Sequence, residues 1–253
     1  MKSMRLLHFI LFVSLAASTG CASLDSKSND SGAASENDSG TDPHDPFESY
    51  NRAIYRFNDS FDRTVAKPVA QAYQDVMPNW ADKGITNFFS NLDDVLVLAN
   101  NLLQLKFKQA ASDAARIVFN TTAGLLGFVD VASHMDLPKH KEDFGQTLGY
   151  WGIPSGPYFV LPFLGPSTIR DTAGLGVDYT YLDPVVNHVD HLSDRAGLFL
   201  LDFVDTRADY LGASRLLDTA ALDPYVYTRE AYLQRRRYYI YDGNPPMEDF
   251  EDK

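Results

Sequence analysis

The chain has 253 residues, of which 45% are hydrophobic, and its formal net charge is -12. That length is enough for one domain with a sizeable core and flexible ends. The acidic balance leaves no basic stripe that could neutralise phosphates, so the sequence predicts no nucleic-acid partner. It also argues against electrostatic adhesion to anionic lipid, so any membrane contact must be apolar or covalent.

The beginning of the chain has the pattern of an export signal. Lys2 and Arg5 give a basic start, and Leu6 to Ala17 is an apolar run of signal-peptide length, too short to span a bilayer comfortably. The only cysteine, Cys21, follows in the sequence LAASTGC and cannot form an internal disulfide. We predict a signal peptide over residues 1–20.

The residues around Cys21 resemble a bacterial lipobox, in which the cysteine becomes the lipidated N-terminus of the mature chain. Thr19 and Gly20 fit its small-residue pattern, whereas Ser18 stands where a leucine is usual. The alternative is ordinary cleavage that leaves a free thiol. We expect lipidation of Cys21, and two or more acyl chains anchor a protein stably. By resemblance to lipoprotein sorting in enterobacteria, Ala22 favours the outer membrane over the inner membrane.

Two polar segments flank the expected domain. Residues 22–44 are mostly Ser, Asp, Asn, Gly, Ala and Glu, so residues 21–44 are predicted to be a lipidated N-terminus and a disordered tether. A flexible chain of this length spans roughly 25 Å on average. The acidic, proline-containing residues 242–253 are predicted to be a disordered tail, which leaves residues 45–241 for the folded domain.

The domain is predicted to be mainly α, because apolar residues recur at steps of three and four along most of it. Asp45 is expected to cap a first helix that carries Phe57 and Phe61 on its apolar stripe and ends at Lys67-Pro68. A short helix should follow to Val76. Further helices are expected over Trp80–Gln104, Phe107–Asn120, Leu125–His134, Glu142–Tyr150, Thr168–Tyr179, from Asp183-Pro184, and over Ser193–Leu211, Ser214–Leu222 and Asp223–Tyr241.

One segment fits neither a buried helix nor a solvated loop. Between Phe144 and Ile169 the chain has no Asp, Glu, Lys or Arg, yet Gly and Pro interrupt it every few positions. We predict a turn or irregular hairpin around Gly152 to Pro157, followed by an apolar ridge from Tyr158 to Leu164. That ridge contacts either acyl chains or the helical core.

Three groups of residues could carry chemistry. Ser155 lies between two glycines whose spacing is wrong for a Gly-x-Ser-x-Gly nucleophile elbow, so a turn is favoured over a lipid hydrolase. The basic run Arg235 to Arg237 is explained by the negative C-terminal end of a helix, with an ionic contact to a partner or lipid head group as the alternative. The best titratable cluster matches no zinc signature, so a solvated helix start is favoured; it consists of Asp183, His188, Asp190, His191 and Asp194. We predict no metal, no catalysis and no cofactor other than covalent lipid on Cys21.

Several blocks in order resemble the MlaA/VacJ family of outer-membrane phospholipid-transport lipoproteins. The likeness covers nearly all of Asp45 to Tyr241. The blocks are DPFESYNR and YRFN in residues 45–58, NFFSNL at 87–92, RIVFNT at 116–121, GFVDVA at 127–132, EDFGQTLG at 142–149, GPY and LPF in residues 156–163, RD at 170–171, and DPY to REAY in residues 223–232.

The resemblance implies a single ring-like helical domain, with an irregular Gly/Pro-rich hairpin, embedded in one leaflet of the outer membrane of a Gram-negative bacterium. Its expected role is to take phospholipid misplaced in the outer leaflet and pass it to a periplasmic phospholipid-binding carrier, on the periplasmic face and beside a trimeric porin. No nucleotide-binding loop is present, which agrees with an energy source elsewhere. The alternative from another class is a periplasmic scaffold lipoprotein that binds a protein through an apolar patch.

The expected lipid- or membrane-contacting residues come from two places. On the first helix, an apolar stripe that also carries Asn51 and Asn58 mixes lipid-like and polar contacts, and the apolar ridge supplies the rest. The candidates are Phe57, Asn58, Tyr158, Phe159, Val160, Leu161, Phe163 and Leu164.

Overall fold

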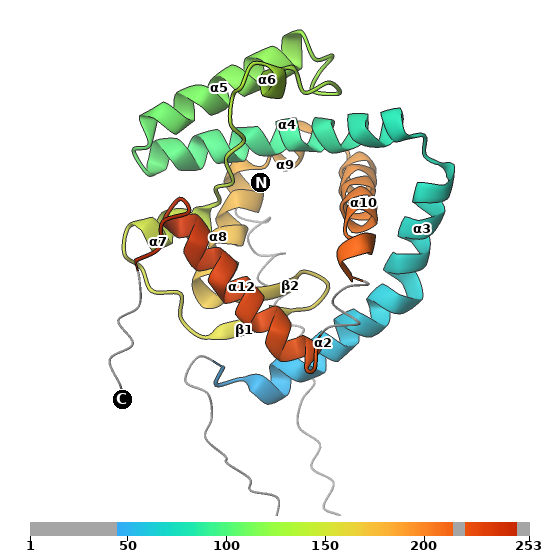
Figure 1. The fold of residues 1–253 in the computed structure, drawn as a ribbon, viewed down its shortest axis with the longest axis vertical. Coiled ribbons are helices and arrows are strands. Elements are labelled where there is room, and N and C mark those ends of the chain that lie inside the picture. Colours follow the sequence, from blue (N-terminus) through green and yellow to red (C-terminus); the bar gives the residue numbers. More distant parts are fainter. Residues whose placement is uncertain (1–44, 215–220, 247–253) are drawn as a thin grey trace, which may run out of the picture. The chain divides into compact units, whose positions relative to one another are not determined.

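The computed structural model describes residues 45–214 and 221–246. These form a mainly helical unit with one short hairpin (Figure 1). Its elements are α2 (Glu48–Phe61), the π-helix η1 (Asp62–Ala66), α3 (Lys67–Val76), α4 (Asn79–Leu103), α5 (Phe107–Thr122), α6 (Val131–His134), α7 (Phe144–Tyr150), β1 (Tyr158–Leu161), β2 (Gly165–Thr168), α8 (Ile169–Val177), the π-helix η2 (Asp178–Leu182), α9 (Pro184–His188), α10 (Leu192–Asp209) and α12 (Pro224–Ile240). The predicted mainly α fold class is confirmed.

The first helix does not end at Lys67-Pro68, and that prediction is wrong. Helices α2, η1 and α3 form one continuous helical run, in which the Lys67 N–H donates to the Asp62 carbonyl one residue beyond the α-helical partner. A proline inside an α-helix clashes with the carbonyl four residues before it. The wider π turn directly before Pro68 accommodates the ring, so the helix continues to Val76.

Contacts between elements close into a ring, which can be followed in Figure 1. The α2–η1–α3 run contacts α10, α10 contacts α4, and α4 contacts α7; α7 then packs on α8, α8 on β2, and β1 returns to α2. Helix α12 lies across α7 and β2, and α5 pairs with α4 along its length. Elements far apart in the sequence therefore meet at β1–α2 and α4–α7.

The Gly/Pro-rich segment forms an antiparallel hairpin, but its turn is later than predicted. Tyr158 pairs with Thr168 and Leu161 with Gly165, so the chain reverses at residues 162–164. Around Gly152 to Pro157 the chain instead leaves α7 through a turn at Gly152 and runs irregularly into β1, with positive φ at Gly152 and Gly156. Thr168 then accepts a hydrogen bond from the Asp171 N–H and starts α8.

Most of the remaining elements lie where the periodicity placed them. The helix expected over Leu125–His134 is an exception, because Leu125 and Leu126 have positive φ values of 54° and 59° and only α6 is helical. The helix expected over Ser214–Leu222 falls largely in residues 215–220, outside the described part. The predicted tail starts too early, because Asp242 pairs with Lys106 and the Pro246 carbonyl accepts a hydrogen bond from Arg237. Residues 1–44 and 247–253 also lie outside the described part. The predicted signal peptide, Cys21 and the predicted tether all fall in residues 1–44.

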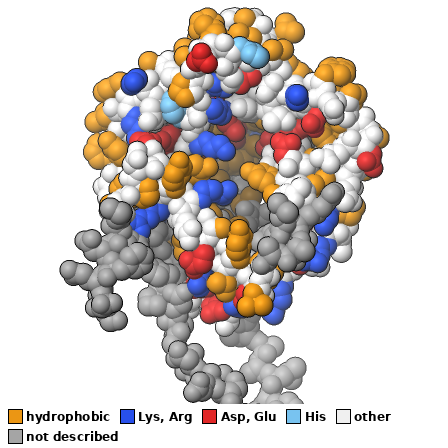
Figure 2. All heavy atoms as spheres, viewed as in Figure 1, with side chains coloured by type: hydrophobic (Ala, Val, Ile, Leu, Met, Phe, Trp, Pro, Cys, Tyr) orange, Lys and Arg blue, Asp and Glu red, His pale blue; other side chains and the backbone are white. Residues whose placement is uncertain are grey.

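The interior of the described part is unusually polar. Buried polar and charged side chains outnumber buried hydrophobic ones, whereas many large hydrophobic side chains are exposed. Figure 2 shows hydrophobic side chains around the edge of one face and charged ones beside a hollow near its middle. No helix within 45–214 or 221–246 combines the length and apolar character that a membrane span requires.

Several buried charges form ion pairs, and the network around Arg116 is one example. The Arg116 side chain is nearly inaccessible, and it donates to the Asp94 carboxylate at 3.3 Å, to Asp130 at 3.3 Å and to the Leu137 carbonyl at 2.8 Å. Asn120 donates to Asp130 at 3.0 Å as well. This network joins α4, α5 and the segment before α6.

We expect Arg116→Leu to lower the free energy of unfolding by about 3–5 kcal/mol, because it removes the buried guanidinium that Asp94 and Asp130 share, although Asp94 retains its pair with Lys139. Urea unfolding followed by circular dichroism measures the loss. The matched control is Arg63→Leu, which removes an exposed pair with Asp59 and should cost at most about 0.5 kcal/mol. Equal losses in the two variants would contradict the role of the buried network.

Candidate functional site

The inner face of the hairpin is fixed to the protein core. Tyr158 and Val160 are both 1% exposed and cluster with Tyr225 of α12. Asn51 of α2 holds the strand edge, since its amide donates to the Tyr158 carbonyl at 3.2 Å and accepts from the Val160 N–H at 2.9 Å. Its side chain thus replaces a neighbouring strand.

Asp45 organises the same junction instead of capping α2, which has Phe47 at its N-cap position. Its buried carboxylate accepts hydrogen bonds from Asn51 at 2.7 Å, from Arg229 at 3.1 Å and from the Tyr225 hydroxyl. Burial and this hydrogen bond raise the pKa of Tyr225, so the hydroxyl stays a donor. The junction ties the start of the described domain to its last helix.

The hairpin turn is fixed by α2 as well. The Asn58 side chain donates to the Leu161 carbonyl at 2.9 Å and accepts from the Phe163 N–H at 2.8 Å. The Phe163 ring makes edge contacts with both Phe57 and Phe61, one helical turn apart, at 5.1 Å between centroids. Because Phe163 has a φ of 63°, a conformation that non-glycine residues rarely adopt, these contacts stabilise a strained turn.

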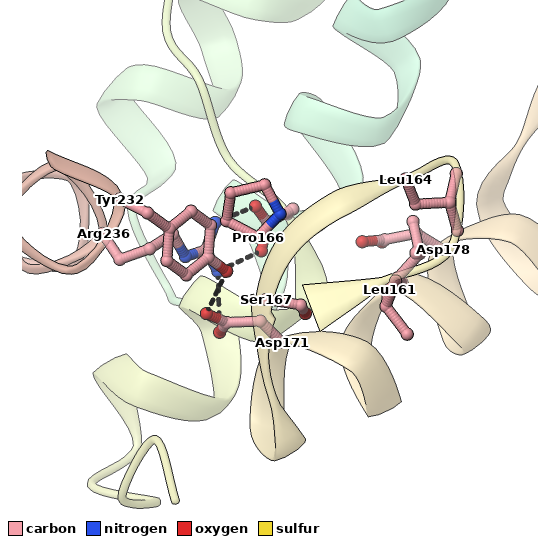
Figure 3. Close-up of a pocket in the computed structure, with 10 residues that line it drawn as sticks. Leu161, Leu164, Pro166, Ser167, Asp171, Asp178, Tyr232 and Arg236 are labelled. Carbon is pink, nitrogen blue, oxygen red and sulfur yellow. Dashed lines mark hydrogen bonds and ion pairs between the residues drawn. The ribbon is translucent and has the colours of Figure 1, made fainter. Parts of the chain in front are cut away.

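A pocket of about 250 Å³ lies beside this hairpin. Its lining is partly apolar and partly charged, and it consists of Asp143, Leu161, Leu164, Pro166, Ser167, Asp171, Leu175, Asp178, Tyr232 and Arg236. Figure 3 shows Tyr232 and Arg236 reaching from α12 toward Asp171, while Leu161, Leu164 and Asp178 lie together on the other side. The hairpin, α8, η2, α12 and the start of α7 all contribute.

Two glycines let the walls of the pocket approach one another. A Cβ atom on Gly174 would lie 2.3 Å from the backbone nitrogen of Gly145, so neither α7 nor α8 could carry a side chain at this crossing. Asp143 accepts from the Gln146 N–H and caps α7. The capping position and the close crossing together place Asp143 beside Asp171.

Arg236 joins these two carboxylates across the pocket. It donates to both oxygens of Asp143 and to Asp171 at 2.9 Å, and Asp171 also accepts from Tyr232 at 2.7 Å and from Arg170 at 2.9 Å. Burial acts to raise the pKa of both carboxyls, but Arg236 outweighs it, with help from Tyr232 at Asp171, and both pKa values fall below their ordinary range.

Asp178 behaves differently. Its oxygens accept from the Phe144 N–H at 2.9 Å and from the Asn100 amide at 3.2 Å, and both donors are neutral. Burial raises the pKa of Asp178 to about 6, because these hydrogen bonds and the more distant Arg236 only partly compensate. The pocket therefore contains one carboxylate that would gain from a cation.

The structure separates the predicted contact residues into two groups. Tyr158, Val160 and Leu161 are buried and contact protein, and Leu161 also lines the pocket. Phe57, Phe163 and Leu164 are exposed by 47%, 50% and 66%, and Phe159 is half-buried with its ring stacked on Tyr50. Asn58 bonds to backbone rather than facing an open space.

The basic run was misinterpreted from the sequence. Arg236 is half-buried and pairs with two aspartates from other elements, so it is not a helix-end cation. The run of three arginines in the sequence gave no indication of these partners. Two members of the predicted cluster of acidic residues and histidines make only local hydrogen bonds. Asp183 caps α9, and His188 is bonded to the Pro184 carbonyl. No group of three potential metal ligands comes together in the described residues.

Fold and site together define a class of protein. The protein is a ring of helices whose interior is polar and contains ion pairs, and many of its apolar side chains are exposed. Its amphipathic pocket is suited to one end of an amphiphilic molecule.

The chain belongs to the MlaA lipoprotein family, whose model matches residues 43–239. It is 37% identical over 228 residues to the intermembrane phospholipid transport system lipoprotein MlaA of Escherichia coli (strain K12), covering 85% of this chain and 89% of that protein. The Haemophilus influenzae protein of the same name is 33% identical over 251 residues, covering 96% and 93%.

A solved structure, from work on the structural basis for maintenance of bacterial outer membrane lipid asymmetry, has the same fold. Its TM-score with this protein is 0.68 at 33% identity, covering 79% of this chain and 99% of the solved one. The family expected from the sequence blocks is confirmed.

We expect Asn58→Ala to loosen the hairpin turn without unfolding the domain, because two hydrogen bonds to the turn backbone are lost. Each is worth about 1 kcal/mol, so the loss of both should raise local opening roughly thirtyfold. Hydrogen exchange of peptides covering residues 158–168 measures it. Asn87→Ala removes one bond to the Phe128 carbonyl elsewhere and should leave that exchange unchanged. Equal uptake in the two variants would refute the assignment.

We expect Asp178→Asn to stabilise the fold relative to the wild type more at pH 7.5 than at pH 4.5. With its pKa raised to about 6, folded Asp178 binds a proton more readily than the unfolded chain does, so its ionised form costs stability as pH rises from about 4 to 6. Chemical denaturation across this range measures the difference. The control is the exposed Asp75→Asn, whose difference from the wild type should not follow this window.

Proposed function

We propose that the protein is the outer-membrane lipoprotein component of an intermembrane phospholipid transport system. It removes phospholipid misplaced in the outer leaflet and passes it to a periplasmic phospholipid-binding carrier, which maintains lipid asymmetry. The single observation that carries this proposal is the pocket beside the hairpin, whose lining combines leucines with three aspartates and an arginine. An amphipathic pocket matches an amphiphilic cargo, and the related proteins bear the name of such a transport system.

Exposed hydrophobic side chains support partial immersion in one leaflet. They gather at the two ends of the α4–α5 pair, with Leu102, Leu103, Leu105 and Phe107 at one end and Leu125, Leu126, Phe128 and Val129 at the other. Each Leu or Phe that leaves water contributes about 1.5–3 kcal/mol, so these residues would favour immersion of the domain once the lipid anchor holds it at the leaflet. Lipid on Cys21 supplies a covalent anchor on the periplasmic face.

In this proposal, the exposed part of the hairpin and α2 contact lipid. Phe57, Phe159, Phe163 and Leu164 meet acyl chains, while Asn58 positions the turn that carries them. Tyr158, Val160 and Leu161 support them from the core. A trimeric porin and the periplasmic carrier remain the proposed protein partners, and no step in this function needs a metal or a catalytic group.

The two alternatives have less support. A nucleophile elbow requires a strand-to-helix turn, but Ser155 follows α7 and precedes β1, and its carbonyl accepts the Arg170 N–H. A scaffold without lipid transport would account for the exposed apolar side chains but not for an amphipathic pocket. Free fatty acid released by the purified protein, and lost in Ser155→Ala, would favour the hydrolase.

A transfer assay tests the function directly. Purified full-length protein in vesicles should co-isolate phospholipid and pass labelled phospholipid to a soluble lipid-binding carrier, because the pocket gives a head group a polar route off the membrane. The control is vesicles without the protein. Failure to co-isolate and to transfer, with partner binding retained, would leave the scaffold as the better account.

We expect Cys21→Ala to release the protein from the membrane fraction and to impair outer-membrane lipid asymmetry, because the covalent anchor is lost. Fractionation and a surface-lipid assay in a strain that lacks the native copy measure both effects. Normal asymmetry in this variant would mean that the exposed apolar side chains anchor the domain without the lipid.

A further inference from the structure

The charges around the pocket do not balance. Arg170 and Arg236 offset Asp171 and Asp143, with which they form ion pairs of 2.9 Å or less. Asp178 is the third acid of the pocket, and its two hydrogen-bond donors are an amide side chain and a backbone N–H. The pocket therefore carries an uncompensated carboxylate within reach of its open volume.

Asp178 is also held rigidly. The Asn100 side-chain amide that donates to Asp178 is oriented by Thr147. The Thr147 hydroxyl donates to the side-chain oxygen Oδ1 of Asn100 at 2.8 Å. Asp178 begins η2, and π-helical turns are rare and frequently mark functional sites. A carboxylate that costs stability, yet is fixed by neighbours from α4 and α7, has the properties of a binding group rather than of a packing residue.

The remaining lining indicates what kind of cation fits. Leu161, Leu164 and Leu175 form the apolar wall, so the charge must be joined to methylene groups. A volume of about 250 Å³ is below the ~300–1,000 Å³ of sites for drug-sized ligands, so it admits one end of a lipid and not a whole molecule. A primary ammonium brings three N–H donors, whereas a quaternary ammonium has none and needs aromatic faces around it.

We propose that this pocket takes the primary ammonium of a zwitterionic phospholipid head group, with Asp178 as its counter-ion and the leucine wall against the adjoining methylene groups. The inference rests on the proposed function and adds a head-group preference to it. Ethanolamine lipids should bind better than glycerol or choline lipids, because only the ethanolamine head group supplies charged N–H donors to the carboxylate.

The test measures binding of three lysophospholipids with the same acyl chain to the full-length protein in neutral detergent, by native mass spectrometry. At pH 7.5, lysophosphatidylethanolamine should bind at least about tenfold more tightly than lysophosphatidylglycerol or lysophosphatidylcholine, as one charge-assisted hydrogen bond predicts. Asp178→Asn should reduce the ratio to about one, and the exposed Asp75→Asn should retain it.

A second measurement needs no variant. Asp143 at the start of α7, Asp171 of α8, and Tyr232 and Arg236 of α12 also line the pocket, and Arg170 pairs with Asp171 beside it. The pKa values of Asp143 and Asp171 are lowered and that of Tyr232 is raised, so these groups keep their charges between pH 5 and 8. Only Asp178, with a pKa of about 6, changes charge there, so the wild type should lose its preference at pH 5.

The outcomes separate this inference from the function on which it rests. A wild type without preference at pH 7.5, or a preference that survives both Asp178→Asn and pH 5, overturns the ammonium site, even if vesicle transfer succeeds. Absence of transfer overturns the proposed function, whereas a measured, Asp178-dependent preference would still establish the site. Absence of any lysolipid binding and of transfer overturns both.

Discussion

The fold depends on pairing the charges that it buries. A buried ion left without its partner costs several kcal/mol, so each charged side chain inside the ring fixes the elements that hold its partners. Arg116 joins α4 to α5 and the segment before α6, and Asp45 joins the start of α2 to α12. Arg236 joins α12 to α7 and α8. These directional pairings lock a closed circuit of helices that a non-directional apolar core would specify less sharply.

A polar interior leaves apolar side chains for the outside. In water that arrangement would be costly, because large exposed hydrophobic patches favour association. In one leaflet of a bilayer the same side chains are in a favourable solvent, and the Gly/Pro-rich hairpin has its backbone hydrogen-bonded by β2, Asn51 and Asn58. The segment that is neither a helix nor a polar loop thus has its backbone groups satisfied by tertiary hydrogen bonds, as the proposed immersion in one leaflet would require.

The properties of the pocket also depend on which of its charges are paired. Three acidic residues converge where α7, α8 and η2 meet, but α12 and α8 supply two arginines, so Asp178 is left with neutral donors. A fully paired cluster would be a structural support with little affinity for a ligand. Because one carboxylate beside the leucines has no cationic partner, the cluster can act as a binding site. The raised pKa of Asp178 reflects this missing partner.

The sequence by itself determined the helical class, most helix positions and the family, because apolar periodicity and local motifs are properties of neighbouring residues. Only the tertiary structure decided what the polar residues of those motifs do. Asp45 looked like a cap and Arg236 like a helix-end cation, since their partners lie 184 and 93 residues away. Pro68 looked like a stop because the π turn that accommodates it has no sequence signature. Long-range charge pairing leaves no periodic trace, so it became visible only when the ring closed.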